Sequence, residues 1–198
     1  MRLLTAPTAE PVTLDEVKFA ARLTGSTAFD TMLPVYIQAA REIAETEAGR
    51  KLMAQVWRIE LADWPHPCQV FELHSATAVA ISYWSTAGTW TDLVIPLKDG
   101  EDPPALINFA WADADPGLAL APLLGANWPT LGEVAIGPRV RVDVTVGAAD
   151  ADNVPAAAKT FIMAMVAYWI ENPQAYTDRP HHASPVALCL LDSIRVGY

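Results

Sequence analysis

The spacing of hydrophobic residues changes twice along this chain of 198 residues, and that change limits its fold more than any other feature. In residues 13–49 and again in 153–198, hydrophobic side chains recur every three or four positions, as on one face of a helix. In residues 52–147 they alternate with polar ones, as on a half-buried strand. We therefore predict an α+β fold in a single domain, residues 1–198. The N-terminal and C-terminal helices should pack together as a small helical bundle, with an antiparallel β unit inserted in the middle of the chain.

The first predicted helix begins at a capping box. Thr13 and Glu16 have the spacing at which each side chain bonds the other residue's backbone N–H. We expect a short helix from there to about Leu23, ended by residues 24–26, Thr-Gly-Ser.

The second predicted helix is long and amphipathic and covers residues 29–48. Asp30 is a candidate N-cap, Pro34 then falls in the first turn, and Gly49 is a candidate C-cap. The predicted buried face consists of Leu33, Tyr36, Ile37, Ala40, Ile43 and Ala44. The charged residues of this segment are expected on its outer face; they are Arg41, Glu42, Glu45 and Glu47.

The middle of the chain contains six segments with the composition or alternation of strands. They are residues 55–61, 70–73, 79–84, 90–95, 105–111 and 140–146. The last is the clearest, with four valines at alternate positions. Residues 85–89 should form a hairpin loop, and residues 116–138 carry only weak strand signals.

Helical spacing returns near the C-terminus. Asp152 is a candidate cap and Pro155 a first-turn residue for a helix over 156–171, which Asn172 and Pro173 should end. Its predicted buried face consists of Ala157, Phe161, Ala164, Met165, Tyr168 and Trp169. A last short helix is expected over 185–194, with Leu188, Leu191 and Ile194 on one side.

Composition restricts the class of function. The net charge is −10, and the 13 Lys and Arg residues are scattered, whereas a nucleic-acid-binding protein needs clustered cations. An acidic surface can still line a channel through which DNA slides. Hydrophobic residues make up 52% and charged ones 18% of the chain. Either some apolar surface is buried between subunits, or the chain is simply rich in alanine.

No motif in the sequence indicates an enzyme. We find no phosphate-binding glycine loop, no nucleophile elbow and no metal-ligand spacing around Cys68 or Cys189. The pair His181–His182 fits a solvated loop better than a metal site. We expect no catalysis, no cofactor and no metal. The sequence also has no signal-peptide pattern and no apolar stretch of membrane-spanning length.

Seven tryptophans are the most unusual part of the composition. Six lie in or beside the predicted β unit: Trp57, Trp64, Trp84, Trp90, Trp111 and Trp128. Exposed aromatic rings on strands can stack on sugars, which suggests a β-rich, carbohydrate-type binding module as an alternative function. Packing in the core or at a subunit interface is the other explanation.

Several collinear segments resemble the head–tail connector (adaptor) proteins of tailed bacteriophages and phage-like gene transfer agents. The opening Leu3–Leu4–Thr5 with residues 11–18, PVTLDEVK, is similar to the start of that family. Residues 39–50 and 52–58 resemble its "A-A-R-E…G-R" and "L-x-x-Q-x-W-R" segments, and residues 127–129 and 140–147 also match. Residues 154–159 and 168–172 resemble its "V-P-x-x-[LI]-K…W-x-E-N" close. Residues 29–34 and the β region depart from the family pattern.

This resemblance implies a structural virion protein of the head–tail neck, assembled in the bacterial cytoplasm. The subunits would form a homo-oligomeric ring, generally twelve-fold, beneath the portal protein. The ring would extend the DNA channel without binding DNA specifically and would carry a stopper or tail-joining neck protein.

The same resemblance places the portal contact in the C-terminal segment, residues 185–198. The candidate partner-binding residues are Leu188, Leu191, Ile194, Arg195 and Tyr198. The alternative for these residues is that they pack on their own subunit.

Overall fold

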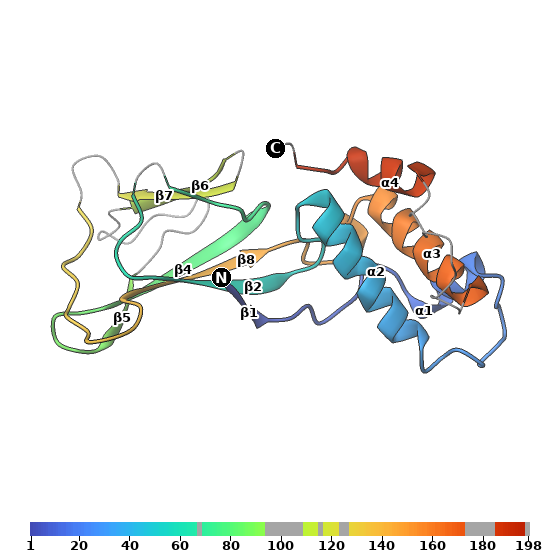
Figure 1. Ribbon diagram of the computed structural model, residues 1–198, viewed down its shortest axis with the longest axis horizontal. Coiled ribbons are helices and arrows are strands. Elements are labelled where there is room, and N and C mark those ends of the chain that lie inside the picture. Colours follow the sequence, from blue (N-terminus) through green and yellow to red (C-terminus); the bar gives the residue numbers. More distant parts are fainter. Residues whose placement is uncertain (67–68, 94–108, 115–116, 123–126, 173–184, 197–198) are drawn as a thin grey trace, which may run out of the picture. The chain divides into compact units, whose positions relative to one another are not determined.

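A computed structural model describes residues 1–66, 69–93, 109–114, 117–122, 127–172 and 185–196. The fold is α+β, as predicted, and the chain forms two compact units (Figure 1). The β unit consists of Met1–Ala6 and Gln55–Gly147, and the helical unit of Pro7–Ala54 and Ala148–Tyr198.

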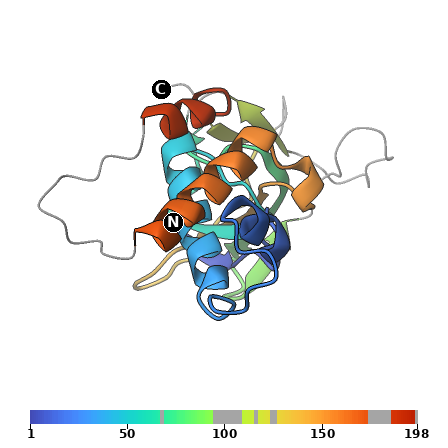
Figure 2. The same ribbon diagram turned by 90° about the vertical axis from the view of Figure 1, so that its right-hand side faces the viewer.

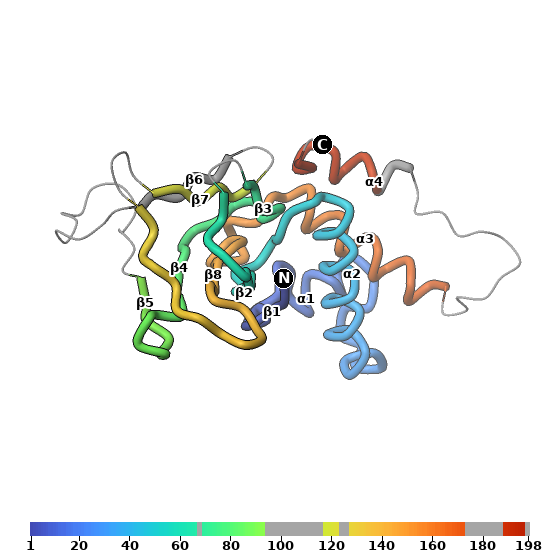
Figure 3. The backbone as a smooth tube through the Cα atoms, turned by 60° about the vertical axis from the view of Figure 1, so that its left-hand side comes forward, coloured from blue at the N-terminus to red at the C-terminus, as the bar shows by residue number. Residues whose placement is uncertain are grey.

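The β unit is built from two antiparallel sheets. The larger has the order β1-β2-β8-β4-β5, from β1 (Arg2–Thr5), β2 (Gln55–Leu61), β8 (Val140–Val146), β4 (Ala76–Trp84) and β5 (Trp90–Leu93). The smaller has the order β3-β7-β6, from β3 (Val70–Phe71), β7 (Gly117–Pro122) and β6 (Phe109–Ala114). Figure 3 shows the chain passing between these strands.

The alternation in β8 defines the core of this unit. Val140, Val142, Val144 and Val146 are fully buried, and they share one hydrophobic cluster with Leu118 and Leu120 of β7. The intervening residues of β8 are half-buried and face the other side of the sheet. The two sheets therefore enclose a core between them.

Most strand predictions are confirmed, with changes at the ends. The hairpin loop 85–89 is closed by a bond from the Ser85 N–H to the Thr89 carbonyl. β4 begins at Ala76, three residues earlier than predicted, and β6 covers 109–114. The predicted strand residues 94–95 and 105–108 lie outside the described residues. Strand β1 was not predicted, because four residues are too few to establish an alternating pattern.

The helical unit contains α1 (Leu14–Ala20), α2 (Leu33–Ala48), α3 (Ala156–Glu171) and α4 (Pro185–Asp192), with a 3₁₀ turn at Ala151–Asn153. Helices from both ends of the chain pack on one another around one hydrophobic cluster (Figure 2). Its fully buried members include Val17 of α1, Leu33 of α2, Phe161 of α3 and Leu191 of α4. The predicted association of the N-terminal and C-terminal helices is confirmed.

The capping box of α1 is present, but the helix ends earlier than predicted. The Thr13 N–H donates to Glu16 Oε2 at 2.7 Å, and the Glu16 N–H donates to Thr13 Oγ1 at 3.2 Å. The helix ends at Ala20 because Arg22 adopts a left-handed φ of 58°. The Leu23 N–H then bonds the Lys18 carbonyl, so Arg22 takes the position that glycine usually fills in this motif.

Two predicted caps are wrong. Helix α2 begins at Leu33 after Met32, and Asp30 instead pairs with Lys18 at 2.5 Å. Helix α3 follows Pro155 directly, and Asp152 lies in the 3₁₀ turn. Pro34 and Gly49 hold their predicted places in the first turn and at the C-cap of α2.

The predicted faces of both long helices need correction. Arg41 and Glu45, expected on the outer face of α2, are each only 4% exposed. In α3 the buried residues are Ala158, Phe161, Ile162 and Val166, whereas Ala164 and Tyr168 are exposed. Phe161 is buried as predicted, and Met165 and Trp169 pack against the core. The rest of the α3 face was wrong because Lys159 and Glu171 are its only charged residues, and apolar residues on every side mark no inner face.

Candidate interaction surfaces

A buried network of charges holds α2 to two other segments of the helical unit. Arg41 Nε donates to Glu10 Oε2 at 2.8 Å, and Arg41 Nη1 donates to Glu45 Oε1 at 3.2 Å. The same Glu45 oxygen accepts the Leu52 N–H at 3.1 Å, and Lys51 Nζ lies 3.5 Å from Glu45 Oε2. Because Glu10 precedes α1 and Leu52 follows α2, the network ties α2 to the segment before α1 and to the segment that follows α2.

The electrostatics of this network keep Arg41 charged. Burial by itself lowers the pKa of Arg41, but the hydrogen bond and charge of Glu10, followed by those of Glu45, outweigh it and raise the pKa above its ordinary value. A charged pair this deeply buried is a structural element, since removing one partner leaves the other uncompensated. The network is therefore part of the scaffold that positions the exposed surfaces of α2.

The polar face of the five-stranded sheet carries a second set of ion pairs. Arg58 donates two hydrogen bonds of 2.6 Å to the Asp143 carboxylate. Glu60 lies 3.6 Å from Arg2 and 3.4 Å from Arg141. The hydrogen bond to Asp143 raises the pKa of Arg58. Because these residues alternate with the buried valines and their neighbours, they cover the face opposite the core.

The tryptophan side chains that the structure describes in the β unit pack mainly against other side chains. Trp64 stacks on Trp128 with ring centroids 4.6 Å apart, and its indole N–H donates to the Pro129 carbonyl. Trp84 and Trp90 meet edge to face at 5.7 Å, and the Arg141 guanidinium lies 3.8 Å from the centre of the Trp90 ring. This arrangement favours a packing role over a set of free stacking platforms.

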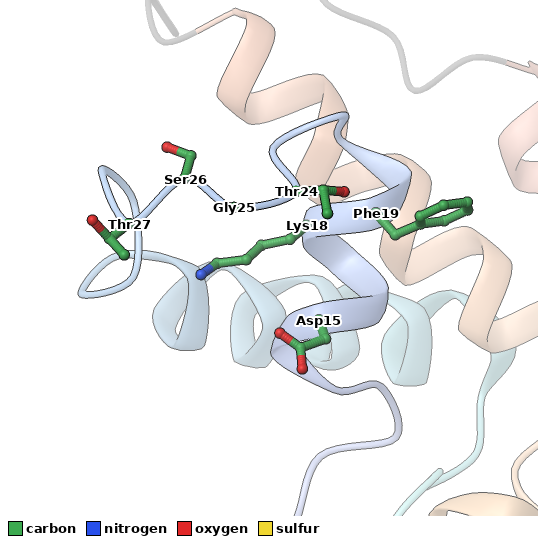
Figure 4. A pocket seen from close by; sticks show the side chains of 7 residues that line it. All are labelled: Asp15, Lys18, Phe19, Thr24, Gly25, Ser26 and Thr27. Carbon is green, nitrogen blue, oxygen red and sulfur yellow. The ribbon is translucent and has the colours of Figure 1, made fainter.

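The helical unit has a shallow hollow of about 420 Å³ between α1 and the following loop (Figure 4). Its lining consists of Asp15, Lys18, Phe19, Thr24, Gly25, Ser26 and Thr27. Lys18 forms an ion pair with Asp30. Phe19 projects away from the loop, and 78% of its surface is exposed. The hollow offers no nucleophile–base pair and is a surface feature.

The part of the chain that the structure describes supports neither a metal site nor a membrane-spanning helix. That part holds no group of three or more His, Cys, Asp or Glu residues placed to bind a metal. None of its helices has the length and apolar character needed to cross a membrane. The pair His181–His182 lies outside the described residues.

The predicted partner-binding residues are split between core and surface. Leu191 is fully buried in the helical core, and Leu188 and Ile194 pack partly against it. Arg195 is exposed; it donates to the Glu47 carbonyl at 3.0 Å and pairs with the Glu47 and Asp192 carboxylates. Tyr198 lies outside the described residues.

An exposed apolar surface on α2 was not predicted, and Ile43, which belongs to it, was wrongly expected on the buried face. Met32, Val35 and Ile43 are all exposed, and Val35 retains 63% of its accessible surface. Its signal was the spacing of these residues, which places them on the side opposite Ile37.

Comparison with known proteins shows which structures share this fold. No protein-family model and no curated protein sequence matches the chain. A solved chain in the virion of a native gene transfer agent particle matches with a TM-score of 0.72 and 20% identity, covering 100% of this chain and 95% of that one.

Two neck structures give the same result. A chain in the neck of an empty gene transfer agent particle, computed with C6 symmetry, has a TM-score of 0.72 and 22% identity. A chain in the neck of a native particle, computed with C12 symmetry, has a TM-score of 0.64 and 19% identity. In both, the match covers 100% of this chain and 97% of the other. The chain therefore has the fold of chains found in the neck and virion of gene transfer agent particles.

Proposed function

We propose that this protein is a structural, non-enzymatic head–tail connector (adaptor) subunit of a tailed bacteriophage or gene transfer agent. The observation that carries the proposal is the full-length structural match to neck chains, over 100% of this chain and 97% of theirs. The collinear connector-like segments in the sequence, from Leu3 to Asn172, support it independently.

In this proposal the subunits form a ring beneath the portal, and we expect the ring to contain twelve copies. The similar neck chains come from structures computed with C6 and C12 symmetry, which supports a cyclic arrangement here. Each copy brings a net charge of −10, so twelve copies would carry about −120. A channel wall of that sign would repel DNA and let it slide without being held.

The proposed partners are the portal above and a stopper or tail-joining protein below. Of the C-terminal candidates, Leu191 serves the subunit's own core. We therefore propose that Arg195 and the half-buried Leu188 and Ile194 make the portal contact, together with Tyr198, which lies outside the described residues. Assembly would take place in the bacterial cytoplasm and the product would reside in the particle neck.

The test is the native mass of the protein alone and mixed with the portal protein from the same genome. We expect a species with a ring of subunits on each portal assembly. A protein that stays monomeric beside a portal shown to assemble with another of its partners would refute the connector function.

A matched pair of variants then tests the portal surface. Arg195→Gln should weaken ring formation on the portal, whereas Arg22→Gln, an equal charge change beyond α1, should not. Thermal melting of each variant alone checks that the fold is retained. Equal binding by both variants would remove Arg195 from the contact.

The same samples address the alternative, a carbohydrate-type binding module. Tryptophan fluorescence measured against a set of sugars would show specific quenching or a spectral shift if the rings of the β unit bound them. The stacking of Trp64 on Trp128 favours the opposite result, an unchanged spectrum.

A further inference from the structure

The outward side of α2 carries a line of uncovered apolar residues, beside the exposed polar residues Gln38, Glu42 and Thr46. Met32, Val35 and Ile43 are exposed and Ala39 between them is half-buried. At 100° per residue these four positions follow one line along the helix, on the side opposite the buried Ile37. We call this line the outer stripe of α2. Apolar side chains at this spacing are typical of a surface that receives another helix.

Helix α3 shows the complementary pattern. It is apolar on every side, as is typical of a helix covered all round, yet only one side is buried within the subunit. Opposite that buried side lie Ala156, Thr160 and Ala164, all exposed, and the half-buried Ala167. We call these four residues the outer stripe of α3. They are small, so a second helix can approach closely and place large side chains between them.

Charge fixes the direction in which the two stripes fit. In α2, all of which the structure describes, the exposed charges are Glu42 and Glu47, both in the C-terminal half. In α3 the cation Lys159 lies near the N-terminus and Glu171 at the C-terminus. An antiparallel contact brings Glu42 and Glu47 to Lys159 and the positive end of the α3 dipole. It also brings Glu171 to the N-terminus of α2, whose first turn has no acidic residue.

We propose that the outer stripe of α2 in one copy packs antiparallel on the outer stripe of α3 in the next copy. Centring the stripes on each other places Val35 opposite Ala167, Ala39 opposite Ala164 and Ile43 opposite Thr160. The two stripes are different surfaces of one subunit, so the contact is head-to-tail and propagates from copy to copy, as a ring requires. This inference rests on the proposed ring and names the surfaces that form it.

Cysteine cross-linking on the portal tests the contact and its direction. Single cysteines at Val35, Ile43, Thr160 or Ala167 are introduced after Cys68 and Cys189 are replaced by alanine. Variants are mixed in pairs with the portal from the same genome, the ring is confirmed by native mass, and the disulfide is formed by mild oxidation. Because all four sites are on the outer stripes, each variant should melt like the parent chain.

The antiparallel pairs V35C with A167C and I43C with T160C should give dimers, because residues that face each other across a close helix contact can reach the Cβ separation of about 4 Å that a disulfide requires. The pairs V35C with T160C and I43C with A167C are the matched controls. Seven residues, or about 10 Å of helix, separate them from contact in the proposed register.

The outcomes separate this inference from the proposed function. A ring that cross-links only through the antiparallel pairs supports both. A ring that cross-links through the control pairs, through one variant alone, or through none of them overturns the α2–α3 contact and leaves the connector function standing. A chain that forms no ring on a competent portal overturns both.

Discussion

Replacing Arg41 with methionine should lower the stability of the helical unit sharply. Methionine keeps most of the apolar stem but removes the cation that Glu45 and Glu10 share. The Glu45 side chain is almost completely buried, so its carboxylate would lose its closest cation in a region of low dielectric constant.

The contacts of Glu45 and Glu10 set the size of the expected loss in unfolding free energy. Breaking a fully buried pair costs about 3–5 kcal/mol. Here Glu45 keeps the Leu52 N–H and a more distant Lys51, and Glu10 is partly exposed, so we expect the lower end of that range, about 3 kcal/mol. With a urea dependence of about 2 kcal/mol per molar, the unfolding midpoint should fall by about 1.5 M.

Urea unfolding of the full chain, followed by far-UV circular dichroism, measures this shift. The control is Arg195→Met, which removes a surface arginine with two ion pairs and should cost under about 1 kcal/mol. In the double variant Arg41→Met with Glu45→Met, the buried Glu45 carboxylate is gone and the Glu10 charge that remains is partly exposed, so part of the lost stability should return. An Arg41→Met midpoint equal to that of the control, or two single losses that simply add, would refute the reasoning.

Three further predictions concern separate parts of the molecule. Phe161→Ala should cost about 3–5 kcal/mol in urea unfolding, because this ring is fully buried, whereas Phe19→Ala, at an exposed ring, should stay within about 0.5 kcal/mol. Gly132→Ala should lower the melting temperature, because a Cβ there would lie 2.1 Å from the Ser85 carbonyl oxygen; an unchanged value would contradict that geometry. The hydrogen bonds of the capping box lower the pKa of Glu16 below its ordinary value of 4.5. The stabilisation that ionised Glu16 contributes is thus present above pH 4.5 and is lost as the pH falls through the lower pKa of Glu16 in the folded state. Wild type and Glu16→Gln should therefore differ in melting temperature near pH 7 and converge in acid.

The sequence alone determined the features that depend on neighbouring residues. The four valines of β8, the capping box at Thr13, the αL residue Gly49 and the limits of α3 were all predicted correctly. Each is set within a few residues, by side-chain alternation, by a cap or by a helix breaker. Local periodicity was also sufficient for the α+β class and for the association of the terminal helices.

Tertiary structure decided which charged and apolar residues are buried. The sequence pattern predicts that Arg41 is a surface residue of an amphipathic helix. Its burial depends on Glu10, 31 positions away. Arg58 finds Asp143 across 85 positions, through strand pairing that no local pattern specifies. Leu191 was a candidate partner contact and is a core residue, while Val35 lies on the surface. Burial is a property of contacts between distant segments, and only the folded chain brings those segments together.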